Sequence, residues 1–446
     1  MARLVIRNCS VLVVPVEGEC RVDEFQDILV EDGVIDQVMP AGAIAAEAGV
    51  EELDATGLIA VPGLVNSHTH SPMVMMRGAA EDVSIDDWFN RRIWPMEVNL
   101  TPERVKAGAR LACAEMLLAG VTTFVDHYFH ADQLAAAALE TGIRADLAPT
   151  FFSSTGADGR EAAYEAAREI RALGSPRITA SLGPHATYTV TEEDLSRTAE
   201  VARAEGFRIH LHAAETEDQT QSSKDRLGAT PIEVLERTGV LDAGALIAHG
   251  CGIVDSDLPI LAKHAARTTV AACPKVYLKL AMGSTTPIKQ LWSAGITVGV
   301  GTDGAAVHNT LDVWESLRLL ALTQKQREQD AEWMTISDTL RLATRGGAAA
   351  AGLPDSIGAI EPGRRADLAL IDPSGPHCQP LHDPRAALVY SVRASDVVTV
   401  VVDGNIVVRD RRLTTVDLDE ILGEAREVAH ALVDLSRGGA VQHYAP

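Results

Sequence analysis

Residues 62–70 of the sequence read Pro62-Gly63-Leu64-Val65-Asn66-Ser67-His68-Thr69-His70. A turn-forming Pro-Gly pair precedes a short apolar run, which predicts a buried β-strand that begins near Leu64. Two histidines stand two residues apart at its end, so both imidazoles lie on the same face of the strand and can share one metal ion. A lone His-x-His pair is weak evidence, and its meaning depends on what the neighbouring strands carry.

Similar apolar runs recur up to about residue 350, separated by stretches rich in Ala, Leu, Glu and Arg that are typical of helices. Eight strand–helix repeats over this length predict an α/β fold, a (β/α)8 TIM barrel. The predicted strands are Leu64–His70, Thr122–His127, Arg144–Phe151, Arg177–His185, Phe207–Ala214, Ala245–Gly250, Thr268–Pro274 and Thr297–Asp303.

Short antiparallel strands are expected on both sides of this barrel. The turn signals Glu31-Asp32-Gly33 and Val402-Asp403-Gly404 stand between paired apolar runs, as hairpins require. We expect the two flanking pieces to combine into one small β-sandwich formed from both chain ends. The expected divisions are residues 1–60 for its first part, 61–355 for the barrel, and 356–446 for its second part together with a closing helix at about 418–435.

Histidine and acidic residues gather at the ends of the predicted strands, where β/α barrels build their active sites. Six of the eight ends carry such groups, which favours a metal site. Imidazole and carboxylate without thiolate suit zinc, iron(II) or manganese. The fourth strand ends without a lysine that could bridge two ions, so one ion is expected. The groups are His68, His70, Asp126, His127, His185, His212, the nearby Glu215, His249 and Asp303.

Composition and charge exclude other classes of protein. The 446 residues include 39 Lys and Arg against 62 Asp and Glu, a formal charge of −23, which repels nucleic acid and anionic lipid. Apolar runs fall far short of the roughly 20 residues that cross a bilayer. The first residues lack a secretory leader and the six cysteines form no Cys-x-x-Cys pair, so we expect a cytoplasmic enzyme with reduced thiols.

Several segments resemble the amidohydrolase superfamily and, within it, the mononuclear aminohydrolases. They are residues 62–70, His212-Ala213-Ala214-Glu215-Thr216, Ala248-His249 and Gly301-Thr302-Asp303-Gly304. The segments His70-Ser71-Pro72-Met73, Arg77 to Asp82, Asp87-Trp88 and Pro95-Met96-Glu97 are most similar to the 5'-methylthioadenosine/S-adenosylhomocysteine deaminases. The resemblance covers nearly the whole chain.

The resemblance implies a hydrolase of carbon–nitrogen bonds in cyclic amidines, which replaces a purine ring amine by oxygen and releases ammonia. The implied ligands of one divalent ion, zinc first with iron or manganese as alternatives, are His68, His70, His212 and Asp303. Such an ion lowers the pKa of its water toward neutrality. Asp303 and His249 would take the proton of the water, and Glu215 would be the proton shuttle.

The resemblance also implies contacts with a small heterocyclic substrate. Trp88 and Glu97 match residues that hold a ribose, and His185 matches one that contacts the base. Arg144 and Arg160 match arginines that reach the far end of the substrate. Members of this superfamily often form dimers or larger rings. A homo-oligomer is therefore possible for this chain, but no feature of the sequence indicates one.

Two segments depart from the family pattern at the mouth of the expected site. Val276-Tyr277 and Val307-His308 each replace a Ser-Asn pair. The base or its substituent could therefore differ, and an aminohydrolase or chlorohydrolase of guanine, a pterin, a cytosine or an s-triazine is the alternative. An amide-ring hydrolase would more often use two metals, and a non-catalytic binding barrel would have lost ligands that this sequence keeps.

Overall fold

A computed structural model describes residues 3–445 of the chain. Strands from the two chain ends pair in one nine-stranded sheet in the order β18-β17-β16-β15-β5-β1-β2-β3, with β4 beside β1. The joint is the antiparallel pair β5–β15, in which Ile59 faces Ile371 and Pro62 faces Leu368. The strands are β1 Arg3–Val13, β2 Arg21–Glu31, β3 Val34–Pro40, β4 Glu51–Asp54, β5 Ile59–Pro62, β15 Leu368–Ile371, β16 Val397–Val402, β17 Asn405–Arg409 and β18 Arg412–Leu413.

The middle of the chain forms parallel strands in two sheets, β10-β8-β7-β6 with β9 beside β8, and β11-β12-β13-β14. An α/β fold with parallel sheets is therefore confirmed. The strands are β6 Leu64–Thr69, β7 Val121–Tyr128, β8 Arg144–Phe151, β9 Ile178–Ala180, β10 Gly183–Pro184, β11 Ile209–Ala213, β12 Ala245–His249, β13 Thr268–Ala272 and β14 Thr297–Val300.

All eight predicted barrel strands begin within two residues of their predicted starts. The fourth differs in another way, because 177–185 is divided into β9 and β10. Pro184 has no N–H to donate to a neighbouring strand. A Cβ on Gly183 would lie 2.6 Å from the carbonyl oxygen of Pro149, so the backbones approach too closely for any other residue. These two residues shorten the pairing.

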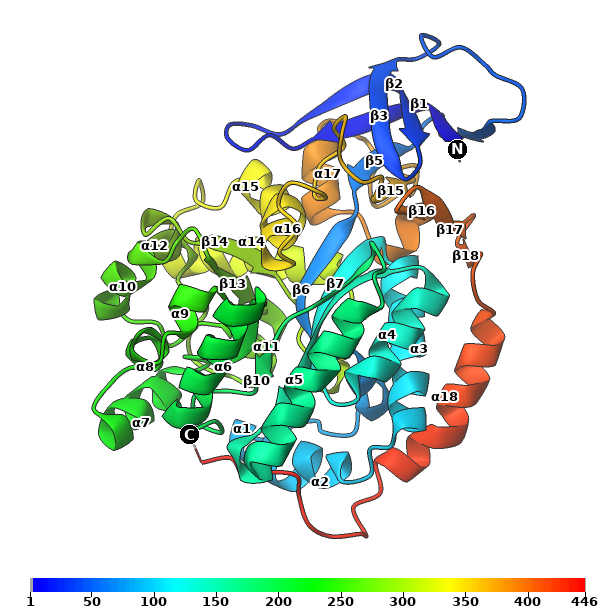
Figure 1. The fold of residues 1–446 in the computed structure, drawn as a ribbon. Coiled ribbons are helices and arrows are strands. Elements are labelled where there is room, and N and C mark those ends of the chain that lie inside the picture. The colour runs from blue at the N-terminus through cyan, green and yellow to red at the C-terminus, as the bar shows by residue number, and fades with distance from the viewer. Residues whose placement is uncertain (1–2, 446) are drawn as a thin grey trace.

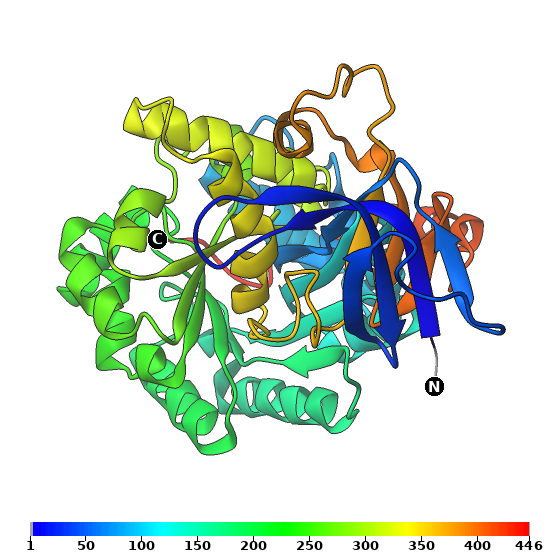
Figure 2. The same cartoon turned by 90° about the horizontal axis from the view of Figure 1, so that it is seen from above.

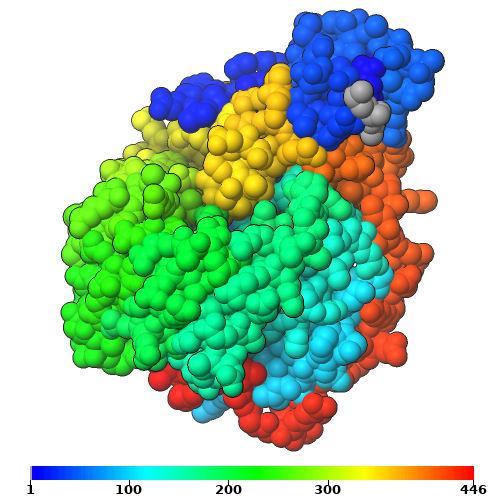
Figure 3. All heavy atoms as spheres, viewed as in Figure 1, coloured from blue at the N-terminus to red at the C-terminus, as the bar shows by residue number. Residues whose placement is uncertain are grey.

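Helices lie outside the parallel strands, and the nine-stranded sheet lies at one end of the molecule (Figures 1 and 2). Figure 3 shows the blue atoms of the N-terminal part of the chain beside the orange atoms that come from near the other chain end. The helices are α1 Ile85–Asp87, α2 Trp94–Glu97, α3 Pro102–Leu118, α4 Ala131–Thr141, α5 Gly156–Ala172, α6 Glu192–Glu205, α7 Glu217–Leu227, α8 Pro231–Arg237, α9 Val240–Ala243, α10 Leu258–Lys263, α11 Pro274–Lys279, α12 Ile288–Ser293, α13 Ala305–His308, α14 Val313–Glu328, α15 Ile336–Arg341, α16 Gly347–Ala350, α17 Pro384–Tyr390 and α18 Leu418–Leu432.

The carboxyl ends of the parallel strands face away from the nine-stranded sheet. The chain leaves β6 at this face and enters α1 and α2, which lie at the opposite end of Figure 1 from β1–β3. The strand ends therefore collect their polar side chains at a single face.

Within residues 3–445, no helix is long and apolar enough to cross a membrane.

Arg144 joins the parallel strands to the nine-stranded sheet. It is the first residue of β8, and its side chain is 2% exposed. Its Nε donates to Asp367 Oδ2 at 2.7 Å, and its Nη2 donates to Asp403 Oδ1 at 3.2 Å. A buried charge needs such partners, because taking it out of water is expensive.

Arg144→Ala is expected to destabilise the protein by about 3–5 kcal/mol, because Asp367 would keep a buried, unpaired charge. The measurement is the midpoint of denaturant unfolding. Arg168→Ala is the matched control, since its ion pair with Glu205 is partly exposed and is worth at most about 1 kcal/mol. Equal losses in the two variants would contradict the assigned role of Arg144.

Candidate active site

Three histidines and one aspartate from three strands converge at the carboxyl face. His68 and the adjacent His70 come from β6, His212 from β11, and Asp303 from the segment after β14. His70 Nε2 lies 3.2 Å from Asp303 Oδ1 and 3.3 Å from His212 Nε2, and His68 Nε2 lies 3.7 Å from the same Asp303 oxygen. The structure thus brings together the four side chains that the resemblance implied as metal ligands.

Hydrogen bonds behind the histidines orient their rings. His70 Nδ1 donates to the carbonyl oxygen of His127 at 2.5 Å, and His212 Nδ1 donates to that of His185 at 2.8 Å. A ring that donates from Nδ1 keeps a lone pair on Nε2, which is the form that binds a metal. Nε2 of each ring therefore faces the shared centre and is available to a metal ion when the ring is neutral.

The donor set fits a metal ion. Nε2 of His68 is buried and has no hydrogen-bond partner in the described part of the chain, an arrangement that is rare in proteins. Nε2 of His70 and Nε2 of His212 lie 3.3 Å apart, so that one cation could contact both of them. Imidazole and carboxylate ligands suit zinc, iron(II) and manganese.

Burial keeps most of these imidazoles neutral. Burial, reinforced by neighbouring histidines, lowers the pKa of His68 and of His212 well below the usual value. Burial also opposes the charge of His70, but the hydrogen bond and charge of Asp303 outweigh it and raise the pKa of His70 to about 9. His68 and His212 thus have the deprotonated form that a metal ligand requires.

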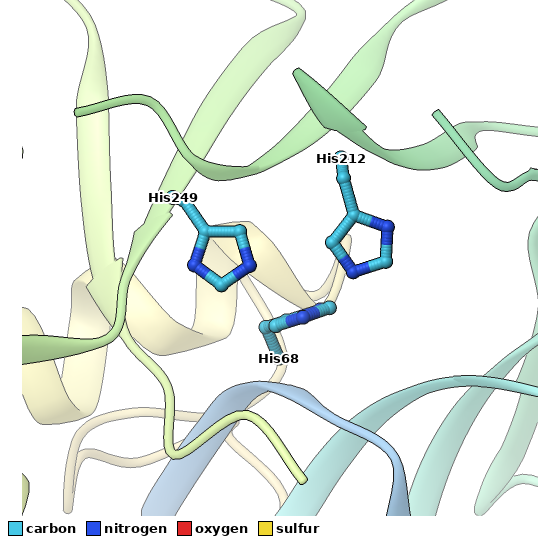
Figure 4. Close-up of side chains that lie close together, drawn as sticks. All are labelled: His68, His212 and His249. Carbon is cyan, nitrogen blue, oxygen red and sulfur yellow. The ribbon is translucent and has the colours of Figure 1, made fainter. Parts of the chain in front are cut away.

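His249 and Glu215 flank the cluster. His249 Nε2, at the end of β12, lies 3.8 Å from Asp303 Oδ2 and 4.0 Å from Glu215 Oε1. Figure 4 shows the rings of His68, His212 and His249 facing a common space. His249 has a φ of 72° and Asp303 a φ of 60°, left-handed conformations that cost free energy in residues other than glycine. Strained backbone therefore aims both side chains at the centre.

A cavity opens beside these groups. Trp88, Glu97 and His185, the three residues nominated for the ribose and base, line it together with Glu215, His249 and Asp303. Tyr128 Oη donates to Glu97 Oε1 at 2.8 Å. Trp88 Nε1 is buried and has no hydrogen-bond partner among residues 3–445, which is rare for a buried donor.

The two departures from the family pattern reach the same cavity. Val276 and Val307 line it, whereas Tyr277 and His308 are buried behind them. Tyr277 Oη accepts from the backbone N–H of Cys273 at 2.7 Å, and His308 Nε2 lies 2.9 Å from Ser316 Oγ. One residue of each altered pair therefore shapes the binding space and the other supports it.

The structure does not bring Arg144 or Arg160 to the cavity. Arg144 lies at the amino end of β8, away from the carboxyl face, and is held by Asp367 and Asp403. Arg160, in the first turns of α5, pairs with Asp194 and with Glu161. Neither guanidinium lines the cavity, so we correct their assignment as contacts to the substrate.

Sequence reasoning missed several residues that support the site. His210 Nε2 lies 2.9 Å from His68 Nδ1 and orients that ring. The signal was present, because His210 and His212 repeat the His-x-His spacing within β11. Tyr128 and Tyr188 gave no such signal, since nothing in their spacing separates them from core aromatics. Asp126, left out of the metal set, accepts from the Ser71 N–H at 2.7 Å.

Comparisons with known proteins agree with this geometry. Residues 59–407 match the model of the amidohydrolase family. The chain is 38% identical to a 5-methylthioadenosine/S-adenosylhomocysteine deaminase of Moorella thermoacetica, over 96% of this chain and 100% of that protein. It is 34% identical to a 5'-deoxyadenosine deaminase of Methanosarcina mazei, over 97% and 99% of the two chains.

Solved structures with the same fold contain zinc. An adenosine deaminase from Xanthomonas campestris with bound zinc has a TM-score of 0.91 and 32% identity, covering 97% of this chain and 98% of its own. An atrazine chlorohydrolase from Arthrobacter aurescens, complexed with zinc, has a TM-score of 0.85 and 26% identity, covering 96% and 100%.

These matches cover nearly the whole chain, and the chain belongs to the amidohydrolase family. It is accordingly a hydrolase that acts on carbon–nitrogen bonds in cyclic amidines, as the resemblance implied.

His68→Ala is expected to reduce bound zinc from about one equivalent to a small fraction, because three ligands remain where four converge. Elemental analysis after dialysis against zinc measures this. His264→Ala, which removes a histidine paired with Asp242 away from the cluster, should leave the zinc content unchanged. Full zinc content in His68→Ala would show that the ligands lie elsewhere.

Proposed function

We propose that this protein is a metal-dependent hydrolytic deaminase of 5'-methylthioadenosine, S-adenosylhomocysteine or a related adenosine, and that it prefers nucleosides whose 5' end carries no charge. The observation that carries the proposal is the convergence of the His68, His70, His212 and Asp303 cluster with Glu215 and His249 in one cavity that Trp88 and Glu97 also line. The names of the relatives, which include a 5-methylthioadenosine/S-adenosylhomocysteine deaminase and a 5'-deoxyadenosine deaminase, support the same reaction.

The proposed cofactor is one divalent ion, with zinc first because solved relatives contain it. His68, His70, His212 and Asp303 would hold it. When bound, the ion supplies Lewis acidity that lowers the pKa of water toward neutrality.

The protein's own groups would then move the protons. Asp303 Oδ2 and His249 Nε2, 3.8 Å apart, are placed to take a proton from water at the centre. Glu215 would give a proton to the ring nitrogen beside the attacked carbon. It would then pass the proton that Asp303 took from water to the departing amine, and it would regain its own proton from the new hydroxyl as that group becomes the carbonyl. Its Oε1 points toward His249 Nε2 at 4.0 Å, so the two proton carriers share one reacting volume.

The proposed ribose site is formed by Trp88 and Glu97. The unpartnered Trp88 N–H offers a donor, and the Glu97 carboxyl accepts from Tyr128 with one oxygen and keeps the other for a hydroxyl. His185, held by a 2.9 Å contact between its Nδ1 and Thr189 Oγ1, lines the same cavity and would contact the base.

The charge of the cavity favours a substrate with a neutral tail. Among the described residues, 3–445, those that line it include no lysine or arginine. Lys275 and Lys279, in the neighbouring α11, are paired with Glu315 and Glu81. The carboxylate of an amino-acid tail would find no cation there. Transferring a carboxylate from water into a cavity where it has no partner costs free energy.

The chlorohydrolase relative and the apolar lining by Val276 and Val307 support one alternative, an aminohydrolase or chlorohydrolase of another N-heterocycle. A free s-triazine, guanine, pterin or cytosine has no ribose, so the Trp88 and Glu97 contacts would stay unused.

We also propose that the two parallel sheets close into one (β/α)8 barrel over residues 61–355, with a β-sandwich built from residues 1–60 and 356–446. Parallel bridges between Leu182 and Ile209 and between Ala186 and His212 support closure on one side. Hydrogen bonds from Thr302 N and Asp303 N to His68 O support it on the other.

The test of function is ammonia release by the zinc-loaded protein across a panel of nucleosides and free bases. We expect the highest kcat/KM on 5'-methylthioadenosine and 5'-deoxyadenosine. The value on S-adenosylhomocysteine should be at least about tenfold lower, because the free energy that corresponds to a tenfold ratio is smaller than the cost of burying an unpaired charge. Activity confined to a free base or a triazine would favour the alternative reaction.

Glu215→Gln is expected to lower kcat by about 10²- to 10⁴-fold while zinc content stays unchanged, because an amide cannot carry the proton. Steady-state rates and elemental analysis test this. Glu217→Gln, an exposed change in the first turn of α7, is the control and should keep full activity. Near-normal kcat in Glu215→Gln would remove Glu215 from the mechanism.

Binding of ribose should depend on pH through Glu97. Burial raises the pKa of Glu97 to about 7, against the hydrogen bond from Tyr128. Above that pH the carboxyl is ionised and is a stronger acceptor, so KM for the nucleoside should fall by about three- to tenfold between pH 6 and pH 8.

Glu97→Gln should raise KM and make it independent of pH over this range. Free adenine serves as the control substrate for the native protein, since it lacks the hydroxyls. A pH-dependent KM that survives in Glu97→Gln would assign the titration to another group.

A further inference from the structure

The segment after α18 crosses the carboxyl face of the parallel strands. We call residues 433–445 the strap; in Figure 1 it is the red chain that passes beneath α2 and ends near α1 and α7. Val441 N donates to the Trp94 carbonyl oxygen at 3.2 Å, and Gln442 Nε2 donates to Ser154 Oγ at 3.1 Å. These hydrogen bonds fix the strap to elements that surround the cavity.

Tyr444 is the one buried residue of the strap. Its backbone N–H donates to Asn90 Oδ1 at 2.8 Å, and Asn90 Nδ2 donates back to its carbonyl oxygen at 3.1 Å. Its ring stacks on Phe89, with centroids 4.6 Å apart and an interplanar angle of 14°, and meets Tyr188 edge-on at 5.4 Å. The ring is therefore held on several sides behind the cavity wall.

The Tyr444 hydroxyl reaches the side chain that holds Glu215. Gln219 Nε2 donates one hydrogen to Tyr444 Oη at 3.1 Å and another to Glu215 Oε2 at 2.9 Å. Gln219 Oε1 accepts from the Glu215 backbone N–H at 3.1 Å. All three groups are buried, so the phenol fixes which way the amide points and thereby which oxygen of Glu215 it holds.

The two oxygens of Glu215 consequently differ. Oε2 accepts from Gln219 and, at 3.3 Å, from the hydroxyl of Tyr188, whose ring packs against Tyr444. Oε1 is directed toward His249 and the metal cluster. We propose that Tyr444 is a positioning residue that acts through Gln219 and Tyr188 to hold Glu215 Oε2, so that Oε1 is presented to the substrate. This inference rests on the proposed proton-shuttle role of Glu215.

The experiment compares Tyr444→Phe with the native zinc-loaded protein of residues 1–446 on 5'-methylthioadenosine. Phenylalanine keeps the stacking on Phe89 and removes only the hydroxyl. We expect kcat to fall by about five- to tenfold, the effect of one lost hydrogen bond, while KM changes less than about twofold. Zinc content and melting temperature should stay at the native values.

Gln442→Ala is the matched control, because it removes a hydrogen bond of the strap that does not lead to Glu215. It should keep native kcat and KM. In a Gln219→Ala background, Tyr444→Phe should cause no additional loss, because the path to Glu215 is already broken.

Native kcat in Tyr444→Phe would overturn the inference. A rise in KM with unchanged kcat would also overturn it, since the strap would then only wall the cavity. Additive losses in the Gln219→Ala background would show that the hydroxyl acts by another route. If the native protein released no ammonia from any nucleoside, the proposed function itself would fail, an outcome distinct from these.

Discussion

One backbone carbonyl joins the first and last parallel strands and sets the site. His68 O accepts from Thr302 N at 3.2 Å and from Asp303 N at 2.9 Å, so the segment after β14 is fixed against the end of β6. The approach is close because Gly301 has no Cβ; one placed there would lie 2.9 Å from that same oxygen. Every contact between Asp303 and the histidines of β6 depends on this junction.

Burial determines which charge states the side chains around this junction can adopt. Four imidazoles and two carboxyl groups lie together there, and each is less than a tenth exposed: His68, His70, His212, His249, Asp303 and Glu215. Groups in such surroundings are stable only when neutral, paired or bound to a cation. The hydrogen bonds behind His70 and His212 satisfy Nδ1 and leave Nε2 for the centre, so the molecule holds a binding geometry before any ligand enters.

The sequence predicted the positions of site residues where those positions follow from the two-residue repeat of a strand or from parallel pairing. Alternation within a strand placed His68 and His70 on one face, and parallel pairing brought His212 and Asp303 to the same edge. Arg144 shows where resemblance alone misled: it is the first residue of its predicted strand, which assigns it to the opposite edge from the site.

Tyr444 could not be found from the sequence. It follows an irregular segment, and its partners Phe89, Asn90 and Gln219 lie far away in the chain with no spacing that relates them. The division of the fourth strand likewise depends on a close backbone approach at Gly183 that no periodic pattern encodes.

The pairing of β5 with β15 has a consequence for synthesis of the chain. During translation, β1–β5 leave the ribosome long before their neighbour β15, so an apolar strand edge stays uncovered while the barrel region is made. Such delayed, non-local pairing slows folding and exposes nascent chains to aggregation, which is the situation in which chaperones act. The strap emerges later than every strand, so a nascent chain can complete its core before Gln219 receives the hydroxyl that orients it.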